Sequence, residues 1–251
     1  MACERQRSEI GVVDPRTSIV NERLKGIRRI IAVSGGKGGV GKSLFASTGA
    51  LILAKKGFKV GLFDLDFTSP STHTILGVQD LRPREEKGLI PPQFHGLEYM
   101  SIIYYSGDYA TPLRGADVSN ALMELLSIVR WGKLDYLILD MPPGIGDATL
   151  DLIRLIERIE FLIVTTPSQL AFETVKKLTG LLQTLKIRVL GIVENMEFAN
   201  SDTIQQETKT LGLTFLGRIP FDKGIEETLG KPDELLDTVF AEKVKQLALR
   251  I

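Results

Sequence analysis

The chain has 251 residues, of which 43% are hydrophobic and 25% charged, and its 31 lysines and arginines balance its 31 aspartates and glutamates. These globular values exclude a disordered or collagen-like chain, and the zero net charge argues against a nucleic-acid partner or a polybasic membrane protein. A single cysteine excludes a disulfide within the chain, and the charged start, with no apolar run approaching about 18 residues, predicts a cytoplasmic protein without an integral membrane segment.

Residues 1–27 are polar and mixed in charge, and we expect an N-terminal arm or short helix there, followed by one domain over 28–251. Beyond the arm, short apolar runs alternate with helical stretches. The runs predicted as strands are 29–33, 58–64, 97–104, 136–140, 161–165, 189–193 and 213–218, and the predicted helices are 43–56, 118–130, 147–157, 168–185 and 233–250. Because most of these strands are continuously apolar and helices separate them, they predict an α/β fold with a mostly parallel sheet and helices on both faces.

The last predicted helix, 233–250, has apolar residues at spacings of three and four. A helix with this pattern can pack on a protein core or lie on a membrane surface. Asp237 and Glu242 offset its lysines, which favours packing on the core.

A glycine-rich segment lies between the first predicted strand and the first predicted helix. It fits the pattern G-x-x-x-x-G-K-[ST] and consists of Gly36, Lys37, Gly38, Gly39, Val40, Gly41, Lys42 and Ser43. Glycines let backbone N–H groups converge on phosphate oxygens, Lys42 supplies charge for the β- and γ-phosphates, and Ser43 can bind Mg²⁺. The pattern predicts a nucleotide-binding P-loop, and the alternative is a glycine-rich turn that packs the helix on the sheet.

Lys37 is an additional cation early in this loop. The form K-G-G-x-G-K-[ST] resembles the deviant Walker A loop of the MinD, ParA and nitrogenase iron-protein class. In that class the first lysine reaches the nucleotide of the partner in a dimer. The resemblance therefore implies a homodimer in which Lys37 acts as an arginine finger does. The alternative is a solvated loop lysine.

Three aspartates follow predicted strands, at the sheet edge where open α/β folds bind ligands. Asp140 ends an apolar run, as in a Walker B strand, and beside a P-loop we expect it to contribute to the Mg²⁺ site through water. On its own it could be a helix N-cap. Asp64 is predicted to support that metal site, and Asp66 is the candidate to orient or deprotonate the attacking water. The prolines and glycines of 141–147 can form a loop that senses the γ-phosphate.

Little competing chemistry is present. His73 and His95 lie far apart without a nearby cysteine and are expected to be surface or capping residues rather than metal ligands. Residues 144–146 lack the rest of a dinucleotide fingerprint, and the G-x-S-x-G pattern of a serine hydrolase does not occur.

A set of segments between residues 24 and 232 carries a resemblance to a known family. The segments are 31–43, 64–71, 114–115, 131–136, 140–147, 164–167, 191–196 and 216–220. Together they resemble the Mrp/ApbC/Nbp family of P-loop ATPases, the ATP-dependent iron–sulfur cluster carriers. The Pro-Pro-Gly and Glu-Asn-Met elements are more specific than the P-loop. The resemblance implies that Asn195 reads the adenine and that Pro220 and its neighbours line the base pocket; from its position alone, Asn195 would be a turn residue at a strand end.

One element of that family is missing. Members that carry clusters usually have Cys-x-x-Cys between the Glu-Asn-Met strand and the next strand, whereas residues 197–212 contain no cysteine here. The chain's one thiol, Cys3, lies in the arm. The resemblance thus implies an ATPase that uses ATP and Mg²⁺, and it leaves an iron–sulfur cluster doubtful as a cofactor.

The leading hypothesis is a dimeric ATPase that hydrolyses ATP to ADP and phosphate as a conformational switch. Its role would lie in iron–sulfur or metallocentre assembly, through an assembly protein that holds the cysteines. The alternative is a positioning or regulatory switch of the MinD/ParA kind that binds a protein, membrane or DNA partner. Phosphorylation of a small molecule is a weaker hypothesis, because no separate acceptor-binding insertion is found.

Overall fold

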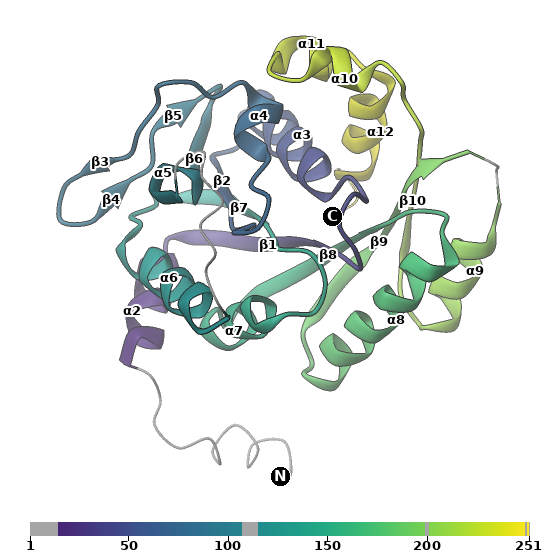
Figure 1. The fold of residues 1–251 in the computed structure, drawn as a ribbon, viewed down its shortest axis with the longest axis horizontal. Coiled ribbons are helices and arrows are strands. Elements are labelled where there is room, and N and C mark those ends of the chain that lie inside the picture. Colours follow the sequence, from purple (N-terminus) through teal and green to yellow (C-terminus); the bar gives the residue numbers. More distant parts are fainter. Residues whose placement is uncertain (1–14, 107–114, 199–200, 249, 251) are drawn as a thin grey trace.

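The computed structural model describes residues 15–106, 115–198, 201–248 and 250 (Figure 1). Its main sheet has eight strands in the order β10-β9-β8-β1-β7-β2-β6-β5. The strands are β1 (Ile27–Gly35), β2 (Val60–Asp64), β5 (Gln93–Phe94), β6 (Leu97–Ser101), β7 (Leu134–Asp140), β8 (Ile159–Thr165), β9 (Arg188–Glu197) and β10 (Phe215–Pro220). Every neighbouring pair is parallel except β5 with β6. The predicted mostly parallel α/β sheet is confirmed.

Helices cover both faces of this sheet (Figure 1). On one face lie α3 (Lys42–Lys55), α4 (Thr72–Leu76), α11 (Pro232–Leu236) and α12 (Val239–Ala248), and on the other lie α2 (Pro15–Leu24), α6 (Gly115–Ile128), α7 (Asp147–Leu155) and α8 (Gln169–Thr184). In β1, Ile30 and Ala32 join the core on one face, while Ile31 and Val33 join the core on the other. Burial on both faces explains why this strand is apolar at each position from residue 30 to residue 33.

Two predicted elements differ from the structure. The strand predicted over 97–104 ends at Ser101, and the short helix α5 (Ile103–Ser106) follows it. The helix predicted over 233–250 is two helices, because Thr238 interrupts it and its Oγ1 accepts a hydrogen bond from the N–H of Ala241 at 3.1 Å. A hydroxyl that caps a helix start in this way favours a new helix over continuation. The prediction that this segment packs on the core is confirmed, since the apolar side chains of α12 are buried.

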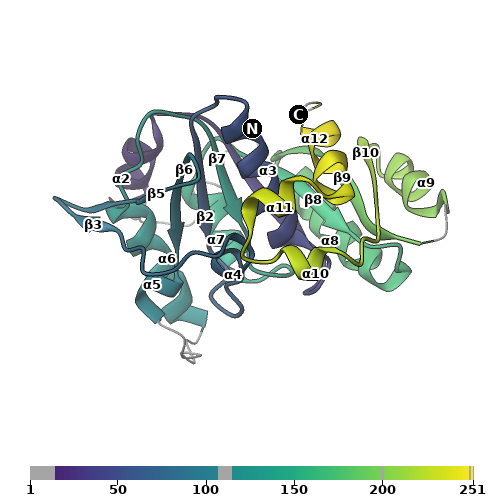
Figure 2. The ribbon, with the colours of Figure 1, turned by 90° about the horizontal axis from the view of Figure 1, so that it is seen from above.

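The structure also contains elements that the sequence did not predict. They are the hairpin of β3 (Arg84–Glu85) and β4 (Leu89–Ile90), the edge strand β5, and the helices α4, α9 (Thr203–Thr210) and α10 (Ile225–Thr228). In α9 only Ile204 and Thr208 are buried, so its apolar signal is weak. The hairpin lies at one end of the molecule and α9 at the other, as Figure 2 shows from above.

The part of the predicted arm that the structure describes is packed on the sheet. Val20 and Leu24 of α2 are buried in the same core as Ile27, the first residue of β1. The boundary between residues 27 and 28 stays a prediction, and Cys3 lies outside the described residues. Within the described ranges, no helix has the length and apolar character needed to cross a membrane.

Candidate functional site

The glycine-rich loop joins the end of β1 to the start of α3. Gly39 and Gly41 have φ angles of 77° and 84°, a region that side chains with a Cβ rarely adopt. A Cβ at Gly41 would lie 2.2 Å from Nδ2 of Asn195, and a Cβ at Gly36 would lie 2.8 Å from the carbonyl oxygen of Ala171. Close neighbours therefore require glycine at both positions, and at Gly41 the backbone geometry requires it as well. Around Gly38, by contrast, the space is open.

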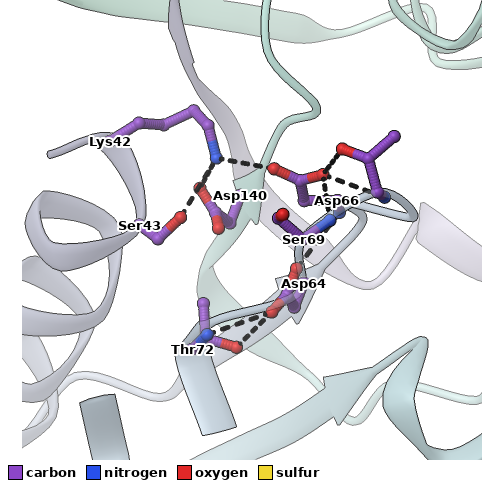
Figure 3. Close-up of polar contacts among 8 residues, drawn as sticks. Lys42, Ser43, Asp64, Asp66, Ser69, Thr72 and Asp140 are labelled. Atoms are coloured by element: carbon purple, nitrogen blue, oxygen red, sulfur yellow. Dashed lines mark hydrogen bonds and ion pairs between the residues drawn. The ribbon is translucent and has the colours of Figure 1, made fainter. Parts of the chain in front are cut away.

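Lys42 lies at the centre of a polar cluster (Figure 3). Its Nζ is 2.7 Å from Oδ1 of Asp140, 3.1 Å from Oγ of Ser43 and 3.7 Å from Oδ2 of Asp66. The side chain of Lys42 is 6% exposed. The structure thus brings together four of the predicted site residues, from β7, the start of α3 and the loop that follows β2.

Asp140 is fully buried at the end of β7. Burial raises the pKa of its carboxyl to about 7, although the neighbouring Lys42 acts in the opposite direction. Its Oδ2 has no hydrogen-bond partner among the described residues. A buried carboxylate oxygen without a partner, close to the Ser43 hydroxyl, provides the hard oxygen ligands that Mg²⁺ prefers. The residues at this position therefore fit a magnesium ion.

Asp64 ends β2, directly beside Asp140 in the sheet register. Its carboxylate accepts hydrogen bonds from the N–H and the hydroxyl of Thr72, at 3.1 and 2.7 Å, and from the N–H of Asp66 at 3.1 Å. The Thr72 hydroxyl also lies 2.8 Å from the Tyr99 hydroxyl. Burial raises the pKa of Asp64. These contacts tie the start of α4 and the Asp66 loop to β2, and the predicted support of the metal by Asp64 stays a prediction.

Thr72 is a site residue that the sequence analysis missed. Its side chain is fully buried and is the principal partner of the Asp64 carboxylate. The available signal was weak: a threonine soon after a strand-end aspartate is common in loops and helix starts. Only the fold shows that this one bends back to the strand.

Asp66 is held in a fixed orientation by its own loop. Its Oδ1 accepts hydrogen bonds from the N–H and hydroxyl of Thr68, at 3.1 and 2.6 Å, and from the N–H of Ser69 at 3.1 Å. The other oxygen, Oδ2, faces Nζ of Lys42 (Figure 3). One carboxylate oxygen is thus anchored while the other faces the P-loop lysine.

Asn195 and Pro220 lie beside the P-loop, at the ends of β9 and β10. Nδ2 of Asn195 donates to the carbonyl oxygen of Val40 at 2.9 Å. A cavity of about 140 Å³ opens there, and Met196 and Phe221 line it together with Asn195 and Pro220. Met196 belongs to the Glu-Asn-Met element and Phe221 is a neighbour of Pro220, but the sequence analysis gave neither residue a role by name. An amide, a proline and an aromatic ring around a small cavity can accept a flat heterocycle next to the phosphate loop.

The comparisons with known proteins agree with this geometry. Over residues 26–251 the chain matches the family model described as ParA: NUBPL iron-transfer P-loop NTPase. The chain belongs to this family. The resemblance found in the sequence is therefore confirmed, and the glycine-rich loop between β1 and α3 fits the P-loop that the description of this family names.

The relatives are named for iron–sulfur cluster transport. The chain is 38% identical to the iron-sulfur cluster carrier protein of Methanocaldococcus jannaschii, with 92% of this chain and 87% of that protein covered. It is 35% identical to the protein of the same name from Aquifex aeolicus, over 86% of this chain. The chain spans only 64% of the length of the Aquifex protein.

Solved structures share the fold of this NTPase. The nucleotide-binding protein of Archaeoglobus fulgidus, in complex with ADP, matches with a TM-score of 0.75 and 30% identity, over 90% of this chain and 96% of that one. The cell division ATPase MinD of Pyrococcus furiosus matches with a TM-score of 0.65 and 23% identity, over 89% and 98%. The second likeness supports the fold alone.

Two further observations concern the partners of Lys37 and the arrangement of metal-ligating side chains in the described residues. Lys37 is half-buried in the loop and makes no hydrogen bond or ion pair with another described residue. The described parts of the chain also hold no group of three or more His, Cys, Asp or Glu side chains arranged to bind a metal ion. His73 and His95 accordingly take part in no such group.

Proposed function

We propose that this P-loop NTPase binds ATP with Mg²⁺ and hydrolyses it to ADP and phosphate, as a dimeric switch in iron–sulfur or metallocentre assembly in the cytoplasm. The observation that carries the proposal is the convergence of Ser43, Asp66 and Asp140 on the Lys42 ammonium, within 3.7 Å. A cation, a hydroxyl and two carboxylates at the mouth of a P-loop are the groups that phosphoryl transfer to water requires.

Binding would begin with a change of partner for Lys42. In the structure, the Lys42 ammonium donates a hydrogen bond to Oδ1 of Asp140 at 2.7 Å. The β- and γ-phosphates offer Lys42 more negative charge than one carboxylate does, so the ammonium is expected to turn to them. Ser43 and, through water, Asp140 would then hold Mg²⁺, which neutralises phosphate charge as the bond to the leaving group breaks.

Asp66 is the proposed group that orients the attacking water. Its Oδ1 is fixed by Thr68 and Ser69, while Oδ2 is directed toward the P-loop lysine. A fixed carboxylate oxygen can accept a hydrogen bond from water and the proton that water loses on attack. In the same proposal, Asn195 and Pro220 hold the adenine, and Lys37 reaches the nucleotide of a second copy.

The cargo is assigned to a partner protein rather than to this chain. Relatives bear the name of cluster carriers, but residues 197–212 lack cysteine. We therefore propose that an assembly protein supplies the thiolates. The missing cysteines and the MinD-like fold favour one alternative, a positioning or regulatory switch. Iron or an assembly protein that copurifies would support the first function, and an ATP-dependent membrane-bound fraction would support the second.

The test of the proposed chemistry is a comparison of Asp66→Asn with the parent. We expect Asp66→Asn to bind ATP with parental affinity by isothermal titration, because the phosphate cradle is intact, and to lose at least about 100-fold in phosphate release, the lower range for general-base loss. Lys42→Ala is the contrasting variant and should lose ATP binding itself. Parental turnover in Asp66→Asn would assign the water to another group, and unchanged ATP affinity in Lys42→Ala would refute the assigned loop.

A further inference from the structure

A second and larger cavity lies near the start of β7, at the opposite end of the strands from the P-loop. It has a volume of about 530 Å³, and three arginines, Arg82, Arg84 and Arg130, line it together with Trp131. Trp131 precedes the first residue of β7, whereas the P-loop cluster lies at the last residue of that strand. The hairpin β3–β4, at one end of the molecule in Figure 2, provides one wall. A ligand here would leave the nucleotide site open.

Backbone contacts and packing fix the walls of this cavity. The N–H of Arg130 donates to the carbonyl oxygen of Leu89 at 2.8 Å, and its guanidinium donates to the carbonyl oxygen of Glu86 at 2.7 Å. These bonds hold the hairpin against the end of α6. The Trp131 ring packs closely over Gly61, where a Cβ would lie 2.9 Å from the ring. The cavity is therefore part of the folded structure rather than a gap between loose segments.

The charges that line the cavity are unbalanced. Arg82 and Arg84 are exposed, and Glu98 is the one acidic residue of the lining. One oxygen of Glu98 already accepts the N–H of Gly132 at 2.8 Å. Beyond the lining, Glu86 lies 4.0 Å from Arg84, and both side chains are mostly exposed, so that pair is weak. Three cations against one carboxylate, in a chain with no net charge, favour an anionic occupant.

We propose that this cavity binds an acidic peptide segment of a partner protein. Guanidinium groups bind carboxylates through paired hydrogen bonds, and Ile90, Pro91 and Trp131 add an apolar wall beside the arginines. A volume of this size accommodates several side chains. A nucleic acid would instead call for a basic stripe along the surface. The inference concerns the chemistry of the partner and does not depend on ATP hydrolysis.

The test uses a peptide of alternating glutamate and leucine, five residues long, and its counterpart with glutamine in place of glutamate. Binding of the fluorescein-labelled peptides to the full chain is followed by anisotropy. Trp131 is the only tryptophan in the chain, so its emission, measured with unlabelled peptide, reports on the cavity itself. We expect the acidic peptide to bind and to change this emission, and the glutamine peptide to bind at least about tenfold more weakly.

Charge reversal then locates the binding. The double variant Arg82→Glu, Arg84→Glu should weaken the acidic peptide at least about tenfold while phosphate release from ATP stays parental. Lys209→Glu, on the exposed face of α9, is the matched control and should bind as the parent does. Equal affinity in the double variant and the control would overturn the proposal. Displacement of the peptide by millimolar inorganic phosphate would instead assign a small-anion site, and displacement by oligo-dT a nucleic-acid site; either result refutes a peptide site.

Discussion

At the scale of single residues, the site holds one lysine and one carboxyl group as a buried pair. Lys42 and Asp140 are 6% and 0% exposed, and their charged atoms lie 2.7 Å apart. Each ion would be costly to bury alone, so the pair persists because each partner compensates the other. The proposed binding of a triphosphate would break this pair, because the phosphates offer Lys42 more negative charge than one carboxylate does.

The pH dependence of folding should report on Asp140. Burial raises the pKa of this carboxyl from 3.8 to about 7. Between these values the folded chain holds a proton that the unfolded chain lacks, so the free energy of unfolding falls as the pH rises through this window. In urea unfolding without nucleotide, we expect the parent to lose stability relative to Asp140→Asn between about pH 4 and pH 7. A constant difference between the two proteins over that window would contradict this assignment.

At the scale of elements, one polar side chain anchors the first turn of the short helix α4, whose buried Ile75 and Leu76 pack in the core. Five residues are too few for a helix to be stable by itself, and the Thr72 hydroxyl ties its first turn to the Asp64 carboxylate and the Tyr99 hydroxyl. This contact also fixes the loop that carries Asp66. The geometry of the proposed catalytic carboxylate therefore depends on a buried hydrogen-bond network behind it.

Thr72→Val tests that dependence. Valine keeps the shape of threonine but leaves a buried oxygen of Asp64 with one donor fewer, so we expect a loss of about 1–3 kcal/mol in the free energy of unfolding. The measurement is urea unfolding, with Thr74→Val on the exposed side of the same helix as the control. Phosphate release should fall in Thr72→Val as well. Equal stability of the two variants would show that the network does not hold α4.

Most strands of the main sheet could be predicted from the sequence because both faces of the sheet are buried, which leaves a continuous apolar run in most of them. Residues 30–33 of β1 are apolar in succession because each face meets its own core. Gly36 and Gly41 of the P-loop are glycines because neighbouring atoms approach them closely. Thr238 gave little warning that it divides the last helix, because the apolar spacing continues across it. Thr72 lies at a helix start, and Met196 and Phe221 lie at strand ends, where no periodicity marks a residue. The tertiary fold shows which of their neighbours these side chains meet.

At the scale of the whole molecule, Lys37 is the loop cation that the proposed dimer would engage. It makes no hydrogen bond or ion pair with any other described residue, unlike Lys42 in the same loop. A second copy of the chain would give it a partner, the nucleotide of that copy. Its charge would then lie where negative charge develops during phosphoryl transfer.

Lys37→Ala should therefore prevent ATP-dependent dimerisation. We expect it to reduce phosphate release at least about 10³-fold, the lower range for a cation that acts across an interface. Sedimentation with and without ATP is the decisive measurement, made in the Asp66→Asn background so that the nucleotide is not consumed. Asp66→Asn alone should dimerise with ATP, and the double variant should not. A monomer in both cases would leave Lys37 a solvated loop residue.

Whether this chain can bind an iron–sulfur cluster is also a question for the whole molecule, because a cluster shared by two copies would need ligands from both. A four-iron cluster normally takes four thiolates. One cysteine per chain gives a dimer two, and no metal-binding group of His, Cys, Asp or Glu occurs in the described ranges. Carboxylate oxygens are poor substitutes at such soft, thiolate-preferring centres. The chain alone is therefore short of ligands, whichever way two copies associate.

We accordingly expect anaerobic reconstitution with iron and sulfide to give no cluster absorbance that survives desalting. The control is the double variant Asn200→Cys, Thr203→Cys, which introduces a Cys-x-x-Cys motif. It lies in the interval 197–212, where cluster-carrying members of the resembled family usually have this motif. If that variant retains iron and the parent does not, ligand number is what limits the parent. About four irons per parental dimer, lost in Cys3→Ser, would contradict this expectation. That result would make the Cys3 thiol a cluster ligand and this chain a cluster carrier.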